Sequence, residues 1–223
     1  MPGTLDLAPL WLTLKVASLA TALAFVASTL LALLLARGRF WGRELLDAAL
    51  TLPLVLPPTV LGYYLLVVVG RKGWIGQWWE DTFGFAFVFT WQGAVLAAAI
   101  VSFPLILKSA RAAFEGVEPN FERAGRTLGV PEWEIFLRIT FPLAWRGVLA
   151  GTLLAFARAM GEFGATLMVA GNLPGRTQTL SLAIYDAVQA GNDPLATTLV
   201  AITSLTCILI LLVSSRLLQA RYI

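Results

Sequence analysis

Five apolar segments, each long enough to cross a bilayer, constrain this chain more than any other feature. They cover residues 10–36, 45–69, 93–113, 147–170 and 195–218. A helix needs about 20 apolar residues to span the hydrocarbon core. Only 13% of the 223 residues are charged, whereas a soluble domain carries about 25%. The sequence therefore predicts an all-α membrane protein with about five spans, in which residues 1–223 form one transmembrane domain.

The second apolar segment is unusually rich in proline. Pro53, Pro57 and Pro58 each remove a backbone donor and bend a helix. In lipid the freed carbonyls are tolerated where other helices or a cavity satisfy them. We therefore expect a kinked span buried in the bundle, with Pro57, Pro58 and Thr59 as candidates for lining a transport path. A purely structural kink explains these residues equally well.

Basic residues collect on one side of the predicted spans. The positive-inside rule places that side in the cytoplasm. With five spans, the N-terminus is then outside and the C-terminus is inside a cytoplasmic (inner) membrane. The residues that carry this argument are Arg37, Arg39, Arg43, Lys108, Arg111, Arg123, Arg126, Arg138, Arg146, Arg216 and Arg221.

The connector over residues 118–142 is a polar insert between the third and fourth spans. Glu118 or Asn120 can begin a helix there, and Gly129 can end it in the left-handed conformation. Pro131 cannot continue that helix but can open a second one. An ordered, charged insert on the cytoplasmic side favours a docking element for another protein. An amphipathic loop lying at the interface is the alternative.

One carboxylate falls inside the fourth segment. Placing Glu162 in a membrane costs about 2.5–3.5 kcal/mol on insertion scales, so the residue is a candidate for function. Arg158 precedes it by one helical turn and can neutralise it. Gly164 permits close helix approach, and Thr166 ends the same run. The pair is predicted to lie at a gate, although simple bracing of the bundle is as good an interpretation.

Two further segments on the predicted outer side are too short or too aromatic to be ordinary spans. Residues 73–90 are rich in Trp and Phe and are expected to lie along the interface. Residues 179–189 are predicted to form a short helix with Leu180, Ile184 and Val188 on one face and Thr179 as its N-cap. That helix can serve as a lid or as a docking surface.

Several kinds of chemistry are excluded by what the sequence lacks. It has no phosphate-binding loop of the Gly-x-x-x-x-Gly-Lys-Ser/Thr type, so ATP hydrolysis by that route is excluded. It has no His and one Cys, which excludes histidine metal sites and a disulfide framework. No basic arm for nucleic acid is present, since the net charge of +3 follows from topology.

The connector and three apolar motifs together resemble the permeases of type I ABC importers, most closely those for molybdate. The connector contributes Glu122-Arg-Ala-Gly-Arg-Thr-Leu-Gly129 and Ile139-Thr-Phe-Pro142, although that family often has Glu-Ala-Ala where this chain has Arg123-Ala124-Gly125. The other motifs are Leu52-Pro-Leu-Val-Leu-Pro-Pro58, residues 93–104, and Ala155-Phe-Ala-Arg158 with Gly161-Glu-Phe-Gly-Ala165.

The resemblance implies a MetI-like permease fold and an ATP-driven importer that works by alternating access. Expected partners are a second copy of this chain, two ABC ATPase subunits, an extracytoplasmic molybdate-binding protein and membrane lipid. No cofactor is expected on this chain, with ATP and Mg²⁺ on the ATPase subunits. The ATPase-coupling residues implied are Glu122, Arg123, Ala124, Gly125, Arg126 and Gly129.

Other functions remain open at this stage. A sulfate/thiosulfate or tungstate permease is the nearest rival. An ion-coupled secondary transporter would need intramembrane carboxylates, of which Glu162 is the one strong candidate. A membrane scaffold without transport is the remaining alternative.

Overall fold

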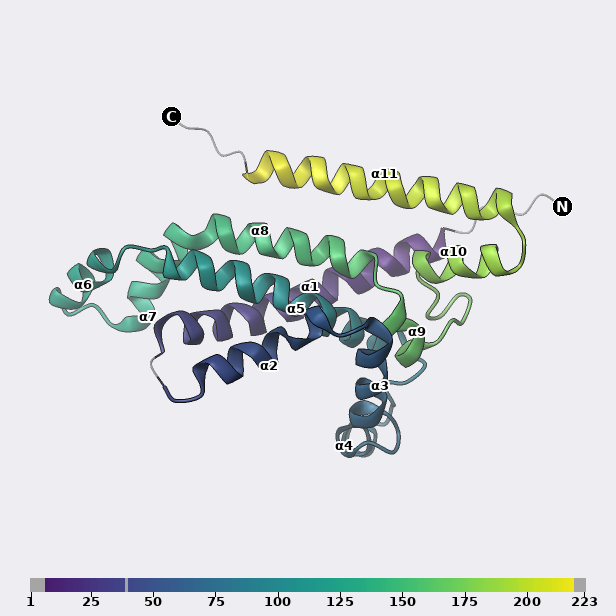
Figure 1. Cartoon of the computed structure of the whole chain (residues 1–223), viewed down its shortest axis with the longest axis horizontal. Coiled ribbons are helices and arrows are strands. Elements are labelled where there is room, and N and C mark those ends of the chain that lie inside the picture. The colour runs from purple at the N-terminus through teal and green to yellow at the C-terminus, as the bar shows by residue number, and fades with distance from the viewer. Residues whose placement is uncertain (1–6, 39, 219–223) are drawn as a thin grey trace.

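The structure is a computed structural model that describes residues 7–38 and 40–218. All regular secondary structure in these ranges is helical (Figure 1), which confirms the predicted all-α class. Arg39 and Arg221, two of the residues behind the predicted orientation, lie outside the described residues.

Three long helices form the core of the bundle. These are α1 (Ala8–Arg37), α5 (Trp91–Glu115) and α8 (Phe141–Met160), and α5 packs against both others. In the most apolar 18-residue stretch of α5, 67% of the residues are buried, and the helix is rich in alanine. Small residues let helix backbones approach closely in lipid, where apolar burial alone gives no preference for protein over acyl chains. A fourth long helix, α11 (Asp193–Leu218), lies along the outside of this core (Figure 1).

The second apolar segment is broken at its prolines, as predicted. It consists of α2 (Arg43–Val55) and α3 (Pro58–Val69), which meet at a bend of 116°. The described residues thus contain 4 helices long enough to span, or up to 5 if the bent pair counts as one. The expectation that this whole segment is buried is wrong for α2, which has no buried residue in the single chain. α2 packs against α5, whereas α3 packs against the short helix α9 (Gly164–Ala170).

The fourth segment differs from the expected continuous span over 147–170. Its helix begins earlier, because α7 (Glu132–Ile135) and the π-helical turn η1 (Phe136–Thr140) lead directly into α8. It ends at Met160, and α9 (Gly164–Ala170) follows after a break over residues 161–163. Glu162 therefore lies in a break between two helices and not inside a helix. The break is stable because the carboxylate satisfies a backbone N–H at the start of α9.

The two short segments predicted on the outer side are helical. α4 (Trp74–Phe83) carries an aromatic cluster, and α10 (Leu180–Gln189) covers the start of α1 (Figure 1). The predicted N-cap is wrong in detail: Thr179 has the cap position but makes no side-chain cap bond. Instead, the buried hydroxyl of Thr13 accepts a hydrogen bond from the N–H of Leu180 at 2.8 Å. Val188 is exposed, so it does not share the buried face of α10.

Candidate functional site

The connector contains the predicted helix, α6 (Pro119–Thr127), at one end of the bundle (Figure 1). Gly129 ends it with a φ of 74°, the left-handed conformation that glycine adopts without strain. The N–H groups of Val130 and Gly129 donate to the carbonyls of Gly125 and Arg126, at 3.2 and 3.0 Å. This paired pattern is a Schellman motif, which satisfies the last carbonyls of the helix and reverses the chain toward α7.

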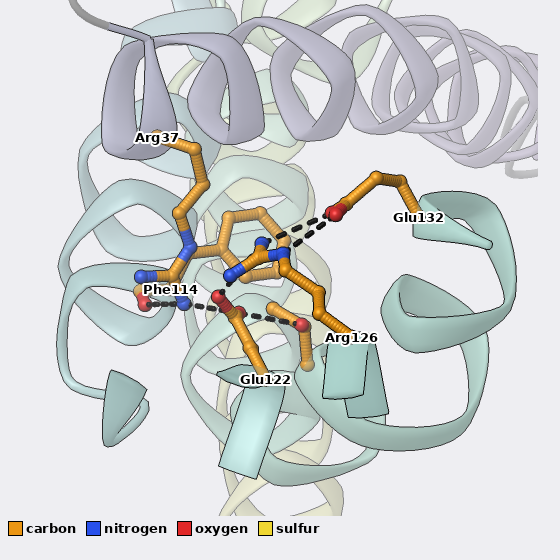
Figure 2. Close-up of polar contacts among 6 residues, drawn as sticks. Arg37, Phe114, Glu122, Arg126 and Glu132 are labelled. Atoms are coloured by element: carbon orange, nitrogen blue, oxygen red, sulfur yellow. Dashed lines mark hydrogen bonds and ion pairs between the residues drawn. The ribbon is translucent and has the colours of Figure 1, made fainter. Parts of the chain in front are cut away.

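Glu122 fixes α6 to the rest of the molecule. Its carboxylate is buried and forms an ion pair with Arg37 in the last turn of α1. The hydroxyl of Thr140 donates to the same Oε1 oxygen at 2.7 Å. Figure 2 shows Arg37 reaching the carboxylate of Glu122, and Arg37 also donates to the backbone carbonyl of Phe114 at 3.1 Å. The ends of α1 and η1 are therefore joined to α6 through one carboxylate, and α5 is joined to the same cluster through Arg37.

A second ion pair holds α6 against α7. Arg126 contacts Glu132 through two nitrogen–oxygen distances of 2.6 and 3.0 Å (Figure 2), the bidentate geometry that gives the strongest arginine–carboxylate pairs. The hydrogen bond to Glu132 raises the pKa of Arg126 above its ordinary value. A more distant contact of 3.7 Å runs from Arg126 to Glu122. Both pairs orient α6, but the exposed pair contributes little to the free energy of unfolding.

The two faces of α6 have different roles. Gly125 lies on the inner face, where an added Cβ would meet Ile135 at 3.1 Å, so the small residue permits close packing on α7. Of the six implied coupling residues, Glu122 and Gly125 are buried within this chain. The other four, which are exposed and free to meet a partner, are Arg123, Ala124, Arg126 and Gly129.

Large apolar side chains surround the exposed face of the connector. Phe121, Leu128 and Trp133 are 52%, 82% and 66% exposed. The sequence did not indicate this exposed surface; on the second helix, Ile135 is the buried residue. The sequence also did not single out Arg37, which was counted only among the basic residues that set the predicted membrane orientation. The exposed tip is suited to a protein partner because it combines apolar area with the cations of α6.

The other candidate residues meet where the two broken spans touch. A Cβ added at Gly164, the first residue of α9, would lie 2.9 Å from Cβ of Pro58, the first residue of α3. One turn further along α3, a Cβ at Gly62 would lie 2.6 Å from Cβ of Met168. The absence of side chains at both glycines lets α3 and α9 pack in direct contact. The structure thus brings together two motifs that lie about a hundred residues apart in the sequence.

Glu162 lies in the break that precedes α9. Its Oε2 is 2.8 Å from Arg158 Nη1, and its Oε1 accepts the N–H of Ala165 at 2.8 Å. The predicted Arg158–Glu162 pair is therefore present. The Glu162 side chain is 2% exposed and that of Arg158 is 34% exposed, so the guanidinium is the more accessible partner. A carboxylate at the first turn of α9 also suits the positive end of that helix.

The remaining residues predicted to line the transport path differ in their solvent exposure. Pro57, Pro58 and Thr59 are exposed at the bend between α2 and α3, where they can face a path or a second chain. Thr166 is buried at 1% exposure and does not reach any open surface of the single chain. Among the described residues, no cluster of three or more His, Cys, Asp or Glu side chains is placed to hold a metal ion.

Comparison with known proteins identifies the family. Residues 28–223 match the family described as binding-protein-dependent transport system inner membrane component. The molybdenum transport system permease protein ModB of Escherichia coli K12 is 48% identical over 204 residues, covering 91% of this chain and 89% of ModB. The putative molybdenum transport system permease YvgM of Bacillus subtilis is 44% identical, covering 84% and 83%. The sulfate permease CysT of Escherichia coli K12 is 35% identical, covering 89% and 74%.

Solved structures agree on the fold. A chain of the inward-facing MetNI methionine ABC transporter superposes with a TM-score of 0.76 at 17% identity, covering 97% of both chains. A chain of a bacterial alginate ABC importer gives 0.79 at 14% identity, covering 97% of this chain and 80% of the other. These structures confirm the expected importer-permease fold, and the family match and the sequence relatives confirm the resemblance drawn from the motifs. The chain belongs to the family of binding-protein-dependent transport system inner membrane components, the multi-pass membrane permeases of ABC importers.

Proposed function

We propose that this chain is the permease subunit of an ATP-driven importer for molybdate. The observation that carries the proposal is the 48% identity to a molybdenum permease over 91% of the chain. Tungstate is an almost isosteric oxyanion and is expected to use the same path. Sulfate is the second candidate, supported by the 35% identity to CysT, and it is the weaker one because that identity is lower and covers less of the relative.

The proposed importer contains two copies of this chain, two ABC ATPase subunits and an extracytoplasmic binding protein. ATP and Mg²⁺ bind to the ATPase subunits, and this chain carries no cofactor of its own. Its path lies at the two-fold axis of the permease dimer. The charge distribution supports an N-terminus outside and a C-terminus inside, which places α6 in the cytoplasm beside the ATPase.

In the proposed mechanism α6 transmits motion. Its exposed side, with Phe121, Arg123 and Leu128, docks in a groove of the ATPase. When ATP draws the two ATPase subunits together, α6 moves with them. The Arg37–Glu122 pair passes that displacement to α1, and the direct run from α7 through η1 passes it to α8. The spans then exchange inward-open and outward-open states.

The contact between the broken spans is the proposed gate. α9 begins where α8 ends, so rotation of α8 displaces α9, and the packing of Gly164 on Pro58 carries α3 with it. Arg158 is accessible enough to attract an oxyanion, while Glu162 holds its side chain and offsets its charge. A partly neutralised cation lets the anion leave as well as enter.

Uptake of radiolabelled molybdate tests the function. The chain is expressed with its ATPase and binding protein in cells that lack their own system, with sulfate or tungstate as competitor. We expect uptake that requires an active ATPase, resists excess sulfate and is reduced by tungstate. Competition by sulfate instead would assign the permease to sulfate. Uptake that persists with an inactive ATPase would contradict the importer mechanism.

A further inference from the structure

A pocket of about 250 Å³ lies at the end of the bundle opposite α6. The first turns of α1, the start of α5 and the loop before α10 enclose it. Its lining combines two cations with two indole rings and includes Trp11, Leu12, Lys15, Trp91, Arg176 and Gln178. None of these residues has a part in the coupling helix or in the contact between α3 and α9.

The two cations of the pocket have no acidic partner among the residues that the structure describes. The ammonium of Lys15 lies 3.6 Å from the centre of the Trp91 ring, which holds it in place without neutralising it. Arg176 is exposed and makes no ion pair within the described ranges. Gln178 of the lining donates a hydrogen bond from its amide to the carboxylate of Asp186 at 2.9 Å. The pocket thus presents net positive charge.

The loop that carries Arg176 is ordered by its own hydrogen bonds. The Leu173 carbonyl accepts the N–H groups of Arg176 and Thr177 at 3.0 and 2.9 Å. The Thr177 hydroxyl in turn accepts the N–H of Leu173 at 3.0 Å and donates to the Gly171 carbonyl. Arg176 is therefore held at the rim of the pocket by a fixed backbone, and only its side chain must be ordered on binding.

We infer that this pocket binds the phosphodiester headgroup of an anionic phospholipid. Lys15 and Arg176 would contact the phosphate oxygens, and the Trp11 indole, which is 72% exposed on α1, would lie at the level of the headgroup. α1 continues from the pocket as an apolar surface with Leu19, Leu23 and Val26 exposed. That surface gives the acyl chains of the same lipid a place to pack.

The lining favours a lipid over a free oxyanion. A free tetrahedral anion is held best by hydrogen-bond donors on several sides, whereas one wall of this pocket is built from Pro9, Trp11 and Leu12. Those apolar side chains match the glycerol and upper acyl region of a lipid. Each cation near an anionic headgroup contributes about 1 kcal/mol, so two make the binding selective for charged lipid.

Native mass spectrometry of the detergent-purified complex tests this site by titration with phosphatidylglycerol or phosphatidylcholine. The variant is Lys15→Gln with Arg176→Gln. The control, Arg71→Gln with Lys72→Gln, removes the same charge from the exposed loop before α4. We expect the first variant to weaken phosphatidylglycerol binding about tenfold or more, and the control to change it by less than about twofold. Phosphatidylcholine should bind weakly to all three proteins. The readout depends neither on transport nor on the transported anion.

Three results would overturn the inference. One is unchanged phosphatidylglycerol binding in the Lys15/Arg176 variant. Another is an equal loss in both variants, which would show a general effect of charge. The third comes from adding millimolar molybdate or inorganic phosphate: if these free anions displace the lipid and their own binding depends on Lys15 and Arg176, the pocket is a site for free oxyanions. Retained co-purification of the ATPase in both variants verifies that the complex is intact.

Discussion

Glu122 in α6 and Arg37 at the end of α1 form an ion pair between residues 85 positions apart in the chain, and its carboxylate is buried while its guanidinium is partly exposed. The same carboxylate accepts a hydrogen bond from Thr140, so three separate segments meet at one side chain. The docking surface of α6 is exposed, but its orientation is set by this internal contact. Residues that never touch the ATPase are therefore expected to control how well it docks.

Glu122→Gln should loosen α6. The substitution keeps a hydrogen-bond acceptor but removes the charge that pairs with Arg37, which is itself 30% exposed. We expect a loss of about 1–2 kcal/mol in the free energy of unfolding, and weaker co-purification of the ATPase. The control is Glu134→Gln, because Glu134 pairs with Arg138, whose side chain is 78% exposed. That control should change stability by less than about 0.5 kcal/mol. Equal behaviour of the two variants would refute the role of the buried pair.

Gly129→Ala should uncouple transport from ATP hydrolysis. Alanine at a φ of 74° costs about 1 kcal/mol, and the strain acts on the turn that ends α6. Gly84 has a φ of 75° at the end of α4, and like Gly129 it has open space where a Cβ would be added, so Gly84→Ala imposes matched strain elsewhere. Molybdate uptake per ATP hydrolysed should fall in the first variant and stay near wild type in the second. Membrane insertion, measured by fractionation, should be normal in both. Full coupling in Gly129→Ala would exclude the turn from the transmission route.

Gly164→Ala should impair the gate. The added methyl would lie 2.9 Å from Cβ of Pro58, whose ring cannot rotate away, so α3 and α9 must separate. Overpacking of this kind costs about 1–3 kcal/mol. Gly161→Ala is the matched control three residues earlier, because its nearest contact would be an ordinary 3.9 Å. Uptake should fall several-fold in the first variant only, with the ATPase still bound. Equal uptake in both would show that α3 and α9 need not stay in contact.

Glu162→Gln should alter transport more than assembly. The amide keeps an acceptor for the Ala165 N–H but leaves the charge of Arg158 unbalanced. A double-mutant cycle with Arg158→Gln separates the pair from its parts, and contacting residues of this type couple by about 0.5–3 kcal/mol. We expect reduced uptake in each single variant and a smaller loss in the double variant than the two single losses predict. If Glu162→Gln prevents the complex from forming, the pair braces the bundle and does not gate it.

The long helices and the connector were predictable because both leave local signals. Hydropathy marked α1, α5 and α11, and Gly129 with Pro131 marked the end of α6 and the start of the next helix. The Arg158–Glu162 pair followed from spacing alone. The same spacing did not reveal that the helix ends at Met160, since residues four apart also meet across a helix end.

Tertiary contacts between distant residues could not be predicted from the sequence. Arg37 counted as one more cytoplasmic charge, because nothing local to it indicates a partner 85 residues away. Pro58 signalled a kink and Gly164 a close helix approach, but the sequence did not show that these two residues contact each other, because that depends on how α3 and α9 pack. The exposure of α2 was missed for a different reason: the prolines indicate that freed backbone groups must be satisfied, but they do not show whether this chain itself covers the helix that carries Pro53.

The contacts of Glu122 also impose an order on biosynthesis. Glu122 contacts Arg37 and Thr140, and Arg37 in turn contacts the carbonyl of Phe114. These residues leave the ribosome at widely separated times. A nascent chain that stops before residue 140 lacks the last of them, even though all of α6 has been made. The contacts that orient α6 are therefore complete only after α1, α5 and residue 140 have been made. If α6 docks on the ATPase as proposed, recruitment of the ATPase is expected to select permeases that have already formed these contacts.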